Sequence, residues 1–441
     1  MKVVAFLPAK GNSERISNKN VSVLSGEKLF INGLKKLLAC KEIDEVVLDT
    51  ESDEMHREVD YLKCSHLKRK LQLASNSTDG HELFLNEIKE FPYGDIYVQY
   101  LCTSPFLKPA TIDKGIKFLK ENPKYDSVVF MKSDKSYVWK GSKPTYGEGR
   151  IPNSKDLPET ITEGMSLYIV RKEVALKNGK RFGDKPYFLF GEPLEYIDIN
   201  NPEDLAAAEI IAEGFKNKEV NRLRLLRHFA SSSMLSDLLD EYCWGTGEEE
   251  AGSVIPGFKP NITGRANVLF GRAKTLKLRR LEKGEEPEGI YKAYSSYSLI
   301  TTNDVIVVEN PVVENAYFGD LNTRIAIRCG ASGAIVSSVT RDSDRVKSFN
   351  FPVYSIGLNA QDVRGRATVE SINKMIEIKG VKIFPNDLIF ADDDAIVVIQ
   401  QDKIDEILRL LMSKIEVESK VSLGIVSNLS TDELLKREGG F

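Results

Sequence analysis

The chain opens on the apolar run Val3-Val4-Ala5-Phe6-Leu7, which is followed by Pro8-Ala9-Lys10-Gly11-Asn12-Ser13-Glu14-Arg15-Ile16-Ser17-Asn18-Lys19-Asn20. The apolar run has the pattern of a buried strand, and the segment after it is a polar loop with three cations around one glycine. In many α/β folds a strand that opens into such a loop holds the phosphates of a nucleotide. Gly11 lets the backbone approach phosphates closely, and cationic side chains neutralise them. The pattern predicts a nucleotide site, and a plain polar surface loop is the alternative.

The length and composition of the chain limit its class. With 441 residues it is too long for one ordinary core, so we expect two or three domains. A net charge of -4 argues against a nucleic-acid binder driven by bulk charge. No apolar stretch reaches the length of a membrane span, and Met1 leads directly into the first strand without a signal peptide. Five scattered cysteines suit reduced thiols rather than disulfides or a zinc site. We therefore expect a cytoplasmic protein without membrane or direct nucleic-acid contacts.

The arrangement of apolar patterns predicts two domains. Strand-like runs alternate with helical patterns up to about residue 215, which predicts an α/β, doubly wound, mostly parallel sheet with helices on both faces. The segment 213–220 is charged and lacks an apolar period, so we place the boundary there, between domains at 1–218 and 222–441. The second domain has many short strands and helical stretches near 321–330 and 402–415, which predicts an α+β or swivelling β/β/α domain.

The first domain resembles the CMP-sugar synthetases, the cytidylyltransferases that activate sialic acids and related ulosonic acids. The loop from Ala9 to Asn20 is similar to the signature of that family. Further matches follow in the family's order, namely the turn Thr103-Ser104-Pro105-Phe106 and the segments Ile197-Asp198-Ile199-Asn200 and Pro202-Glu203-Asp204-Leu205. The resemblance covers roughly residues 1 to 215. It implies an enzyme that transfers CMP from CTP to an acidic sugar and releases pyrophosphate.

The resemblance also assigns roles to residues. It implies that Lys10 and Lys19 are catalytic phosphate contacts and that Asp198 binds Mg²⁺, which prefers carboxylate oxygens. The CTP-binding residues it implies are Ala9, Lys10, Gly11, Asn12, Ser13, Arg15, Lys19, Asn20, Thr78 and Gln99. The sequence departs from the family at four positions. This chain has Lys10 where the family has its first Arg, and Asn200 where the family has the second Asp of the closing pair. It has Leu101 where the family has a Gln, although Gln99 lies two residues upstream, and it has Cys102 where the family has a Pro. A degenerate cytidylyltransferase kept for binding is the alternative.

The second domain carries Gly319-Asp320, then twenty residues, then Arg341-Asp342. This spacing and its flanks, over roughly 225 to 415, resemble the RraA-like superfamily. That superfamily includes metal-dependent 4-hydroxy-4-methyl-2-oxoglutarate aldolases and the regulator of ribonuclease E activity. The resemblance implies that Asp342 binds a divalent metal, that Arg341 is catalytic and holds a keto-acid carboxylate, and that Asp320 orients metal-bound water. Backbone amides after Gly319, at Leu321 and Asn322, would complete the substrate site.

Two departures and an alternative qualify the second site. Ser337-Ser338 stands where the family has Asp-Gly, and Arg345 stands where the aldolases have an acidic residue. An Arg-Asp pair that only staples a turn is the alternative.

Three hypotheses follow for the whole chain. The first is a bifunctional enzyme of surface-glycan synthesis, in which a metal-dependent aldolase acting on a 2-keto acid such as pyruvate sits beside CMP activation. The second is a cytidylyltransferase with a non-catalytic RraA-like domain for oligomerisation or regulation. The third is a regulator of an RNA-processing nuclease with a vestigial first domain. The two resemblances together imply a homo-oligomer, either a trimer or a hexamer.

Overall fold

The computed structural model describes residues 1–11, 19–75, 77–147, 149–247 and 252–438, which divide into two compact units at Ile211 and Ala212. Among those residues, no helix combines the length and the apolar character needed to cross a membrane. The loop residues Asn12, Ser13 and Arg15, which the sequence assigned to CTP, lie outside the described residues.

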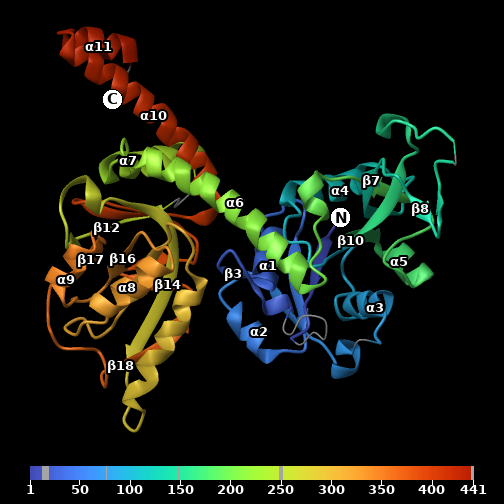
Figure 1. Ribbon diagram of the computed structural model, residues 1–441, viewed down its shortest axis with the longest axis horizontal. Helices are drawn as coiled ribbons and strands as arrows, with labels where there is room; N and C mark the ends of the chain where they lie inside the picture. The colour runs from blue at the N-terminus through green and yellow to red at the C-terminus, as the bar shows by residue number, and fades with distance from the viewer. Residues whose placement is uncertain (12–18, 76, 148, 248–251, 439–441) are drawn as a thin grey trace. The chain divides into compact units, whose positions relative to one another are not determined.

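The first unit is built on a seven-stranded sheet in the order β11-β7-β10-β6-β1-β4-β5 (Figure 1). Every pair in it is parallel except the two pairs made by β10. The strands are β1 (Val3–Pro8), β4 (Glu45–Thr50), β5 (Ser65–Lys68), β6 (Ile96–Tyr100), β7 (Ser127–Asp134), β10 (Thr160–Arg171) and β11 (Pro186–Leu189). Two short hairpins, β2 (Val23–Leu24) with β3 (Glu27–Lys28) and β8 (Trp139–Lys140) with β9 (Lys143–Pro144), lie outside the sheet.

Helices cover both faces of this sheet. They are α1 (Leu29–Leu38), α2 (Asp53–Glu58), α3 (Gly80–Glu90), α4 (Pro109–Glu121) and α5 (Lys172–Asn178). Alternate strand residues point to opposite faces, and Phe6 and Val170 pack in one cluster with Phe84 of α3 and Ala175 of α5. On the other face, Gly33 of α1 lies against Leu7 and Gly115 of α4 lies against Ile169. The doubly wound, mostly parallel sheet predicted from the sequence is therefore confirmed.

The second unit contains a larger sheet of mixed pairing, in the order β12-β22-β21-β14-β15-β16-β17-β13. Its strands are β12 (Gly252–Pro256), β13 (Lys259–Pro260), β14 (Leu269–Arg280), β15 (Val305–Glu309), β16 (Gly333–Val336), β17 (Val353–Ser355), β18 (Ala367–Ile372), β21 (Leu388–Ala391) and β22 (Ala395–Ile399). The long strand β14 pairs with β21 through its first residues and with β18 through its last ones. From β14 to β17 the pairing is parallel. A small hairpin joins β19 (Ile376–Ile378) to β20 (Val381–Ile383).

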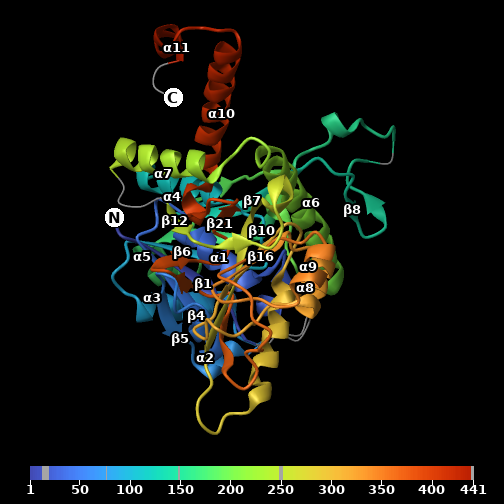
Figure 2. The ribbon, with the colours of Figure 1, turned by 90° about the vertical axis from the view of Figure 1, so that its left-hand side faces the viewer.

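The helices of this unit are α7 (Ser232–Thr246), α8 (Asp320–Arg328), α9 (Ser343–Ser348), α10 (Ile404–Val426) and α11 (Thr431–Glu438). Alternation along β21 sends Leu388 and Phe390 to the cluster beneath α7 and α10 and sends Ile389 and Ala391 to the opposite face. Helix α10 continues beyond α7 and carries α11 at its end (Figure 2). Ser231 caps α7 by accepting from the Met234 amide.

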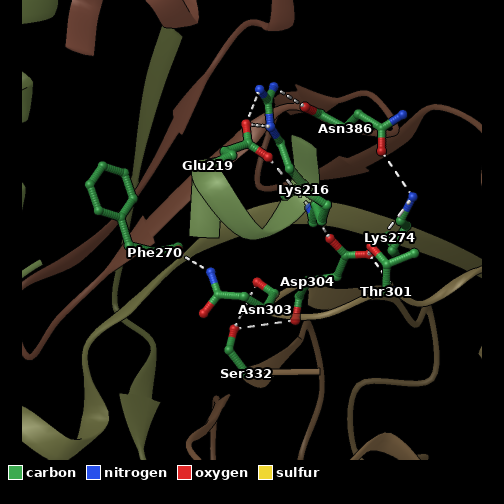
Figure 3. A network of polar contacts seen from close by, with 10 residues as sticks. Lys216, Glu219, Phe270, Lys274, Thr301, Asn303, Asp304, Ser332 and Asn386 are labelled. Carbon is green, nitrogen blue, oxygen red and sulfur yellow. Dashed lines mark hydrogen bonds and ion pairs between the residues drawn. The ribbon is translucent and has the colours of Figure 1, made fainter. Parts of the chain in front are cut away.

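The segment 213–220, expected to be an irregular link, is helical and belongs to the 25-residue helix α6 (Pro202–Leu226). Two of its charged residues are engaged within the unit, because Lys216 donates to the fully buried carboxylate of Asp304 at 2.8 Å and Glu219 accepts from Arg272 (Figure 3). The other two, Glu213 and Lys218, are exposed. Asp304 also accepts from the amide and the hydroxyl of Thr301. Charged side chains that pack inward remove the apolar period, which is why the pattern resembled a linker.

This network supports a stability prediction. Asp304→Ala should lower the free energy of unfolding by about 3 to 5 kcal/mol, because it leaves Lys216 and the nearly buried Lys274 without their shared carboxylate. Urea denaturation measures the loss, and Glu416→Ala, which breaks an exposed ion pair with Lys420, is the matched control that should not move the midpoint. Equal midpoints for the two variants would show that the Asp304 network carries no stability.

Candidate active sites

The first candidate site lies where the loops after β1 and β6 diverge, at the carboxyl ends of two adjacent parallel strands. In open α/β sheets this switch point is where ligands bind. Asn20 joins the two loops, because its side-chain amide donates to the Lys10 carbonyl at 2.9 Å and its Oδ1 accepts from the Cys102 thiol at 3.4 Å. Burial raises the pKa of Cys102 to about 12, so this thiol stays protonated and is not a nucleophile.

The segment before α6 meets the same place. Lys19 donates through Nζ to the carbonyl of Ile199 at 2.7 Å, one residue after Asp198 in the chain. The Asn200 side chain donates to Oδ2 of Asp198 at 2.7 Å, whereas Oδ1 of Asp198 is buried with no hydrogen-bond partner among the described residues. The structure therefore brings together Lys10, Lys19, Asn20 and Asp198, which lie far apart in the sequence.

The start of the loop is held close to β4. The Ala9 amide donates to the Asp49 carbonyl at 2.9 Å, and the Gly11 amide donates to Oε1 of Glu51 at 2.7 Å. A Cβ on Gly11 would lie 3.1 Å from Cβ of Ser52, so a larger residue there would crowd the turn that follows β4.

The other two residues assigned to CTP lie differently. Thr78 bonds locally, through its hydroxyl, to the Gln72 carbonyl and to Ser75. Gln99 is 1% exposed, and both ends of its amide are engaged. Its Nε2 donates to Glu87 at 2.7 Å, and its Oε1 accepts from Nη1 of Arg181 at 3.2 Å. Gln99 thus connects the core of the domain to a cation that the sequence analysis did not identify.

Arg181 stands at the edge of this network. Its guanidinium lies over the ring of Tyr168, 4.0 Å from the centroid, and its Nε is buried without a hydrogen-bond partner among the described residues. His81 accepts from the Arg181 backbone amide at 3.2 Å and so holds the segment that carries it. Burial and the Arg181 charge lower the pKa of His81, which keeps it neutral and able to accept.

Beneath Gln99 lies a buried ionic cluster. Arg69 forms a bidentate pair with Asp49, and both side chains are almost completely buried. Burial and the neighbouring Asp49 carboxylate raise the pKa of Glu87 well above its usual range, although Arg69 and Gln99 act in the opposite direction. A protonated Glu87 donates its hydrogen to Asp49, which satisfies the carboxyl oxygen that has no other partner.

The donors at the switch point fit a magnesium ion. No three His, Cys, Asp or Glu side chains gather into a complete cage in the parts of the chain that the structure describes. Mg²⁺ usually keeps several waters and takes one or two carboxylates together with substrate phosphates. Asp198, with its buried and unpartnered Oδ1, provides such a carboxylate.

The second candidate site is a pocket of about 570 Å³ in the second unit, where α8 and α9 begin after the parallel strands β15 and β16. The residues that line it include Gly319, Asp320, Leu321, Asn322, Arg341 and Asp342. A Cβ on Gly319 would lie 2.6 Å from Oδ2 of Asp342, so only glycine permits this approach. Asp342 adopts a left-handed backbone, with φ of 57°, and accepts from the Asp320 amide at 3.2 Å.

The arginines at the pocket pair with different carboxylates. Nη2 of Arg341 lies 2.7 Å from Asp362, which orients its guanidinium beside Asp342. Asp320 is paired with Arg324 at 2.9 Å and with Arg345 at 3.6 Å. Arg345, which the sequence marked as a departure from the aldolases, therefore neutralises the carboxylate expected to orient a metal-bound water. Asp342 has one arginine contact, at 3.7 Å from Arg341, whereas Asp320 has two. Asp342 is therefore the better carboxylate for a cation that also takes oxygens from a bound acid.

Comparison with known proteins finds a family match in each of the two units. Residues 4–163 match the cytidylyltransferase family model, and residues 234–398 match the Aldolase/RraA model. A CMP-N,N'-diacetyllegionaminic acid synthase of Legionella pneumophila is 27% identical over 48% of this chain and 97% of its own length. A putative 4-hydroxy-4-methyl-2-oxoglutarate aldolase of Halalkalibacterium halodurans is 30% identical over 33% of this chain and 66% of its own. Protein DlpA of Legionella pneumophila is 28% identical over 37% of this chain, and the match spans 27% of DlpA.

The family match and the relatives of the first domain support a nucleotidyltransferase. More particularly, the chain joins a cytidylyltransferase domain related to the CMP-sugar synthases to a C-terminal RraA-like domain.

The buried carboxyl of Glu87 supports a prediction about pH. A raised pKa means that folding favours the protonated form, so this stabilisation is complete below about pH 4.5 and is lost as the pH rises through the folded-state pKa. Glu87→Gln keeps a neutral donor at every pH and should flatten the decline in unfolding free energy above that point. Urea titrations from about pH 4.5 to 8 measure this, with Glu90→Gln, an exposed position on the same helix, as the control. Parallel profiles for Glu87→Gln and the unmodified protein would contradict it.

Proposed function

We propose that the first domain transfers CMP from CTP to a hydroxyl of an acidic sugar and releases pyrophosphate. The observation that carries this proposal is the convergence of Lys19 with the Asp198 segment at the switch point of the sheet. The sugar oxygen bonds to the α-phosphorus while the bond to the pyrophosphate oxygen breaks. Negative charge develops on the phosphates, and fixed cations that face it lower the barrier.

The residues divide this work among themselves. Lys10 and Lys19 neutralise the phosphates, and the backbone at Gly11 lets them approach. Mg²⁺, when held by Asp198, would add charge neutralisation at the same phosphates. Arg181 offers a guanidinium to the carboxylate of the sugar, because its Nε is buried without a partner among the described residues and its Nη1 makes one long contact with Gln99. The relative named as a CMP-N,N'-diacetyllegionaminic acid synthase supports the choice of acceptor.

For the second domain we propose binding of a 2-keto acid. Arg341 takes the carboxylate, assisted by the first amides of α8 at Leu321 and Asn322, and Asp342 lies where a cation would meet the keto oxygen. Aldol cleavage is the second candidate, favoured by the adjacency of Arg341 and Asp342 in one pocket. The pairing of Asp320 with Arg324 and Arg345 favours binding over cleavage.

Lys19→Ala should reduce kcat/KM for CMP transfer about a hundredfold, because it removes a cation that faces the developing charge. Pyrophosphate release from CTP and Mg²⁺, with a panel of sialic and ulosonic acids as acceptors, measures the rate. Lys19→Arg should recover part of it, and Lys89→Ala, an exposed lysine of the same domain, should leave it unchanged. Equal rates with ATP or UTP in place of CTP would count against the assignment.

Arg341→Ala should weaken pyruvate binding at least tenfold, because a charged hydrogen bond to the carboxylate is lost. Calorimetry of the full chain with pyruvate and Mg²⁺ measures the affinity, and Arg328→Ala at the exposed end of α8 is the control. Pyruvate release from 4-hydroxy-4-methyl-2-oxoglutarate decides between binding and cleavage. An affinity for pyruvate that does not change in Arg341→Ala would rule out this pocket as the keto-acid site.

A further inference from the structure

One wall of the second pocket is a column of tyrosines that lies outside the Asp-Arg-Asp motif. The 3₁₀ helix Pro287–Leu299 places tyrosines three residues apart, at 291, 294 and 297. A 3₁₀ helix has three residues per turn, so side chains at this spacing lie directly above one another. Tyr291 and Tyr294 stack with centroids 6.0 Å apart and planes at 22°, and Tyr294 and Tyr297 follow at 6.4 Å and 31°.

The column is buried at one end and open at the other. Tyr297 is 5% exposed and packs in the core, whereas Tyr291 and Tyr294 are 46% and 47% exposed and line the pocket together with Arg341. Because the buried Tyr297 packs in the core, it fixes the position of the rings of Tyr294 and Tyr291 that stack beyond it. The pocket therefore presents a rigid aromatic face beside a carboxylate-binding group.

Charged groups connect this aromatic face to Arg341. The Arg364 guanidinium lies 5.6 Å from the ring of Tyr291 and pairs with Glu288 of the same 3₁₀ helix. The Arg364 amide donates at 2.6 Å to Asp362, whose other oxygen pairs with Arg341. Arg364 and Asp362 thus provide hydrogen-bond donors and acceptors between the ring of Tyr291 and Arg341.

The size of the pocket exceeds the needs of a small keto acid. About 570 Å³ lies within the range of pockets that enclose drug-sized ligands. A three-carbon acid held at Arg341 would leave the tyrosine face empty. A ligand that fills the pocket carries its carboxylate at one end and a larger body with an apolar face at the other.

We propose that this pocket binds a sugar acid, with its carboxylate at Arg341 and its ring or hydroxylated chain against Tyr291 and Tyr294. A sugar has an apolar face of C–H groups that packs on an aromatic ring, and its hydroxyls need the donors and acceptors that Arg364 and Asp362 supply. The proposal rests on the proposed keto-acid site and names its substrate class. It makes Tyr291 and Tyr294 specificity-determining residues for the second domain.

Calorimetry of the full chain, with Mg²⁺ and without CTP, tests this with N-acetylneuraminate and pyruvate as the two probes. The double variant Tyr291→Ala with Tyr294→Ala should bind N-acetylneuraminate about tenfold more weakly and pyruvate with unchanged affinity. The double Phe variant, which keeps the stacked rings, should retain most of the affinity. Arg341→Ala should lose both ligands. Tyr137→Ala, at a tyrosine of the first domain that is 43% exposed, is the control.

The outcomes separate this inference from the function it rests on. If pyruvate binding depends on Arg341 but N-acetylneuraminate binding ignores the tyrosines, the sugar-acid subsite is wrong and the keto-acid site stands. If N-acetylneuraminate binds Arg341→Ala as it binds the unmodified chain, its site is elsewhere and the inference fails. If neither acid binds the unmodified chain, the keto-acid site itself is refuted, and the inference falls with it.

Discussion

Parallel pairing of neighbouring strands brings the loops that follow them to one edge of a sheet, and both candidate sites depend on this constraint. In the first domain, β1 and β6 are parallel neighbours, so Lys10 and Asn20 meet Cys102 across more than eighty residues of sequence. In the second domain, β15 and β16 are parallel neighbours, so α8 and α9 begin side by side and Asp320 meets Asp342. Two unrelated sheets thus assemble charged residues by the same geometric rule.

The two sites differ in how their charges are balanced. At the first, Lys19 binds the carbonyl of Ile199, the residue after Asp198, and Oδ1 of Asp198 has no hydrogen-bond partner among the described residues. At the second, each carboxylate of the pocket already contacts an arginine. The first arrangement suits a ligand that carries both phosphates and a cation. The second suits an anion that replaces one of the existing ion-pair contacts of Arg341.

The sequence predicted what depends on local patterns and on motif spacing. The parallel sheet follows from such patterns, and Asp320, Arg341 and Asp342, which the motif spacing singled out, line one pocket. Arg181 and the buried pair of Glu87 with Asp49 were missed because their partners come from distant strands. The tyrosines at 291, 294 and 297 carried a signal in their spacing of three, although it becomes a wall only if the segment forms a 3₁₀ helix. The segment 213–220 is helical although it lacks an apolar period, because Lys216 and Glu219 make polar contacts within the unit.

The repeat of three in the tyrosine column also bears on how such a pocket would diverge in evolution. Because all three rings share one side of a helix with three residues per turn, inserting or deleting a single residue before Tyr291 would rotate the whole column by about a third of a turn. A point substitution would change one ring of the tyrosine column. One such insertion would turn all three rings away from the pocket and leave Arg341 and Asp342 unchanged. The tyrosines that would select the body of the ligand can therefore change in evolution independently of the charged residues Arg341 and Asp342.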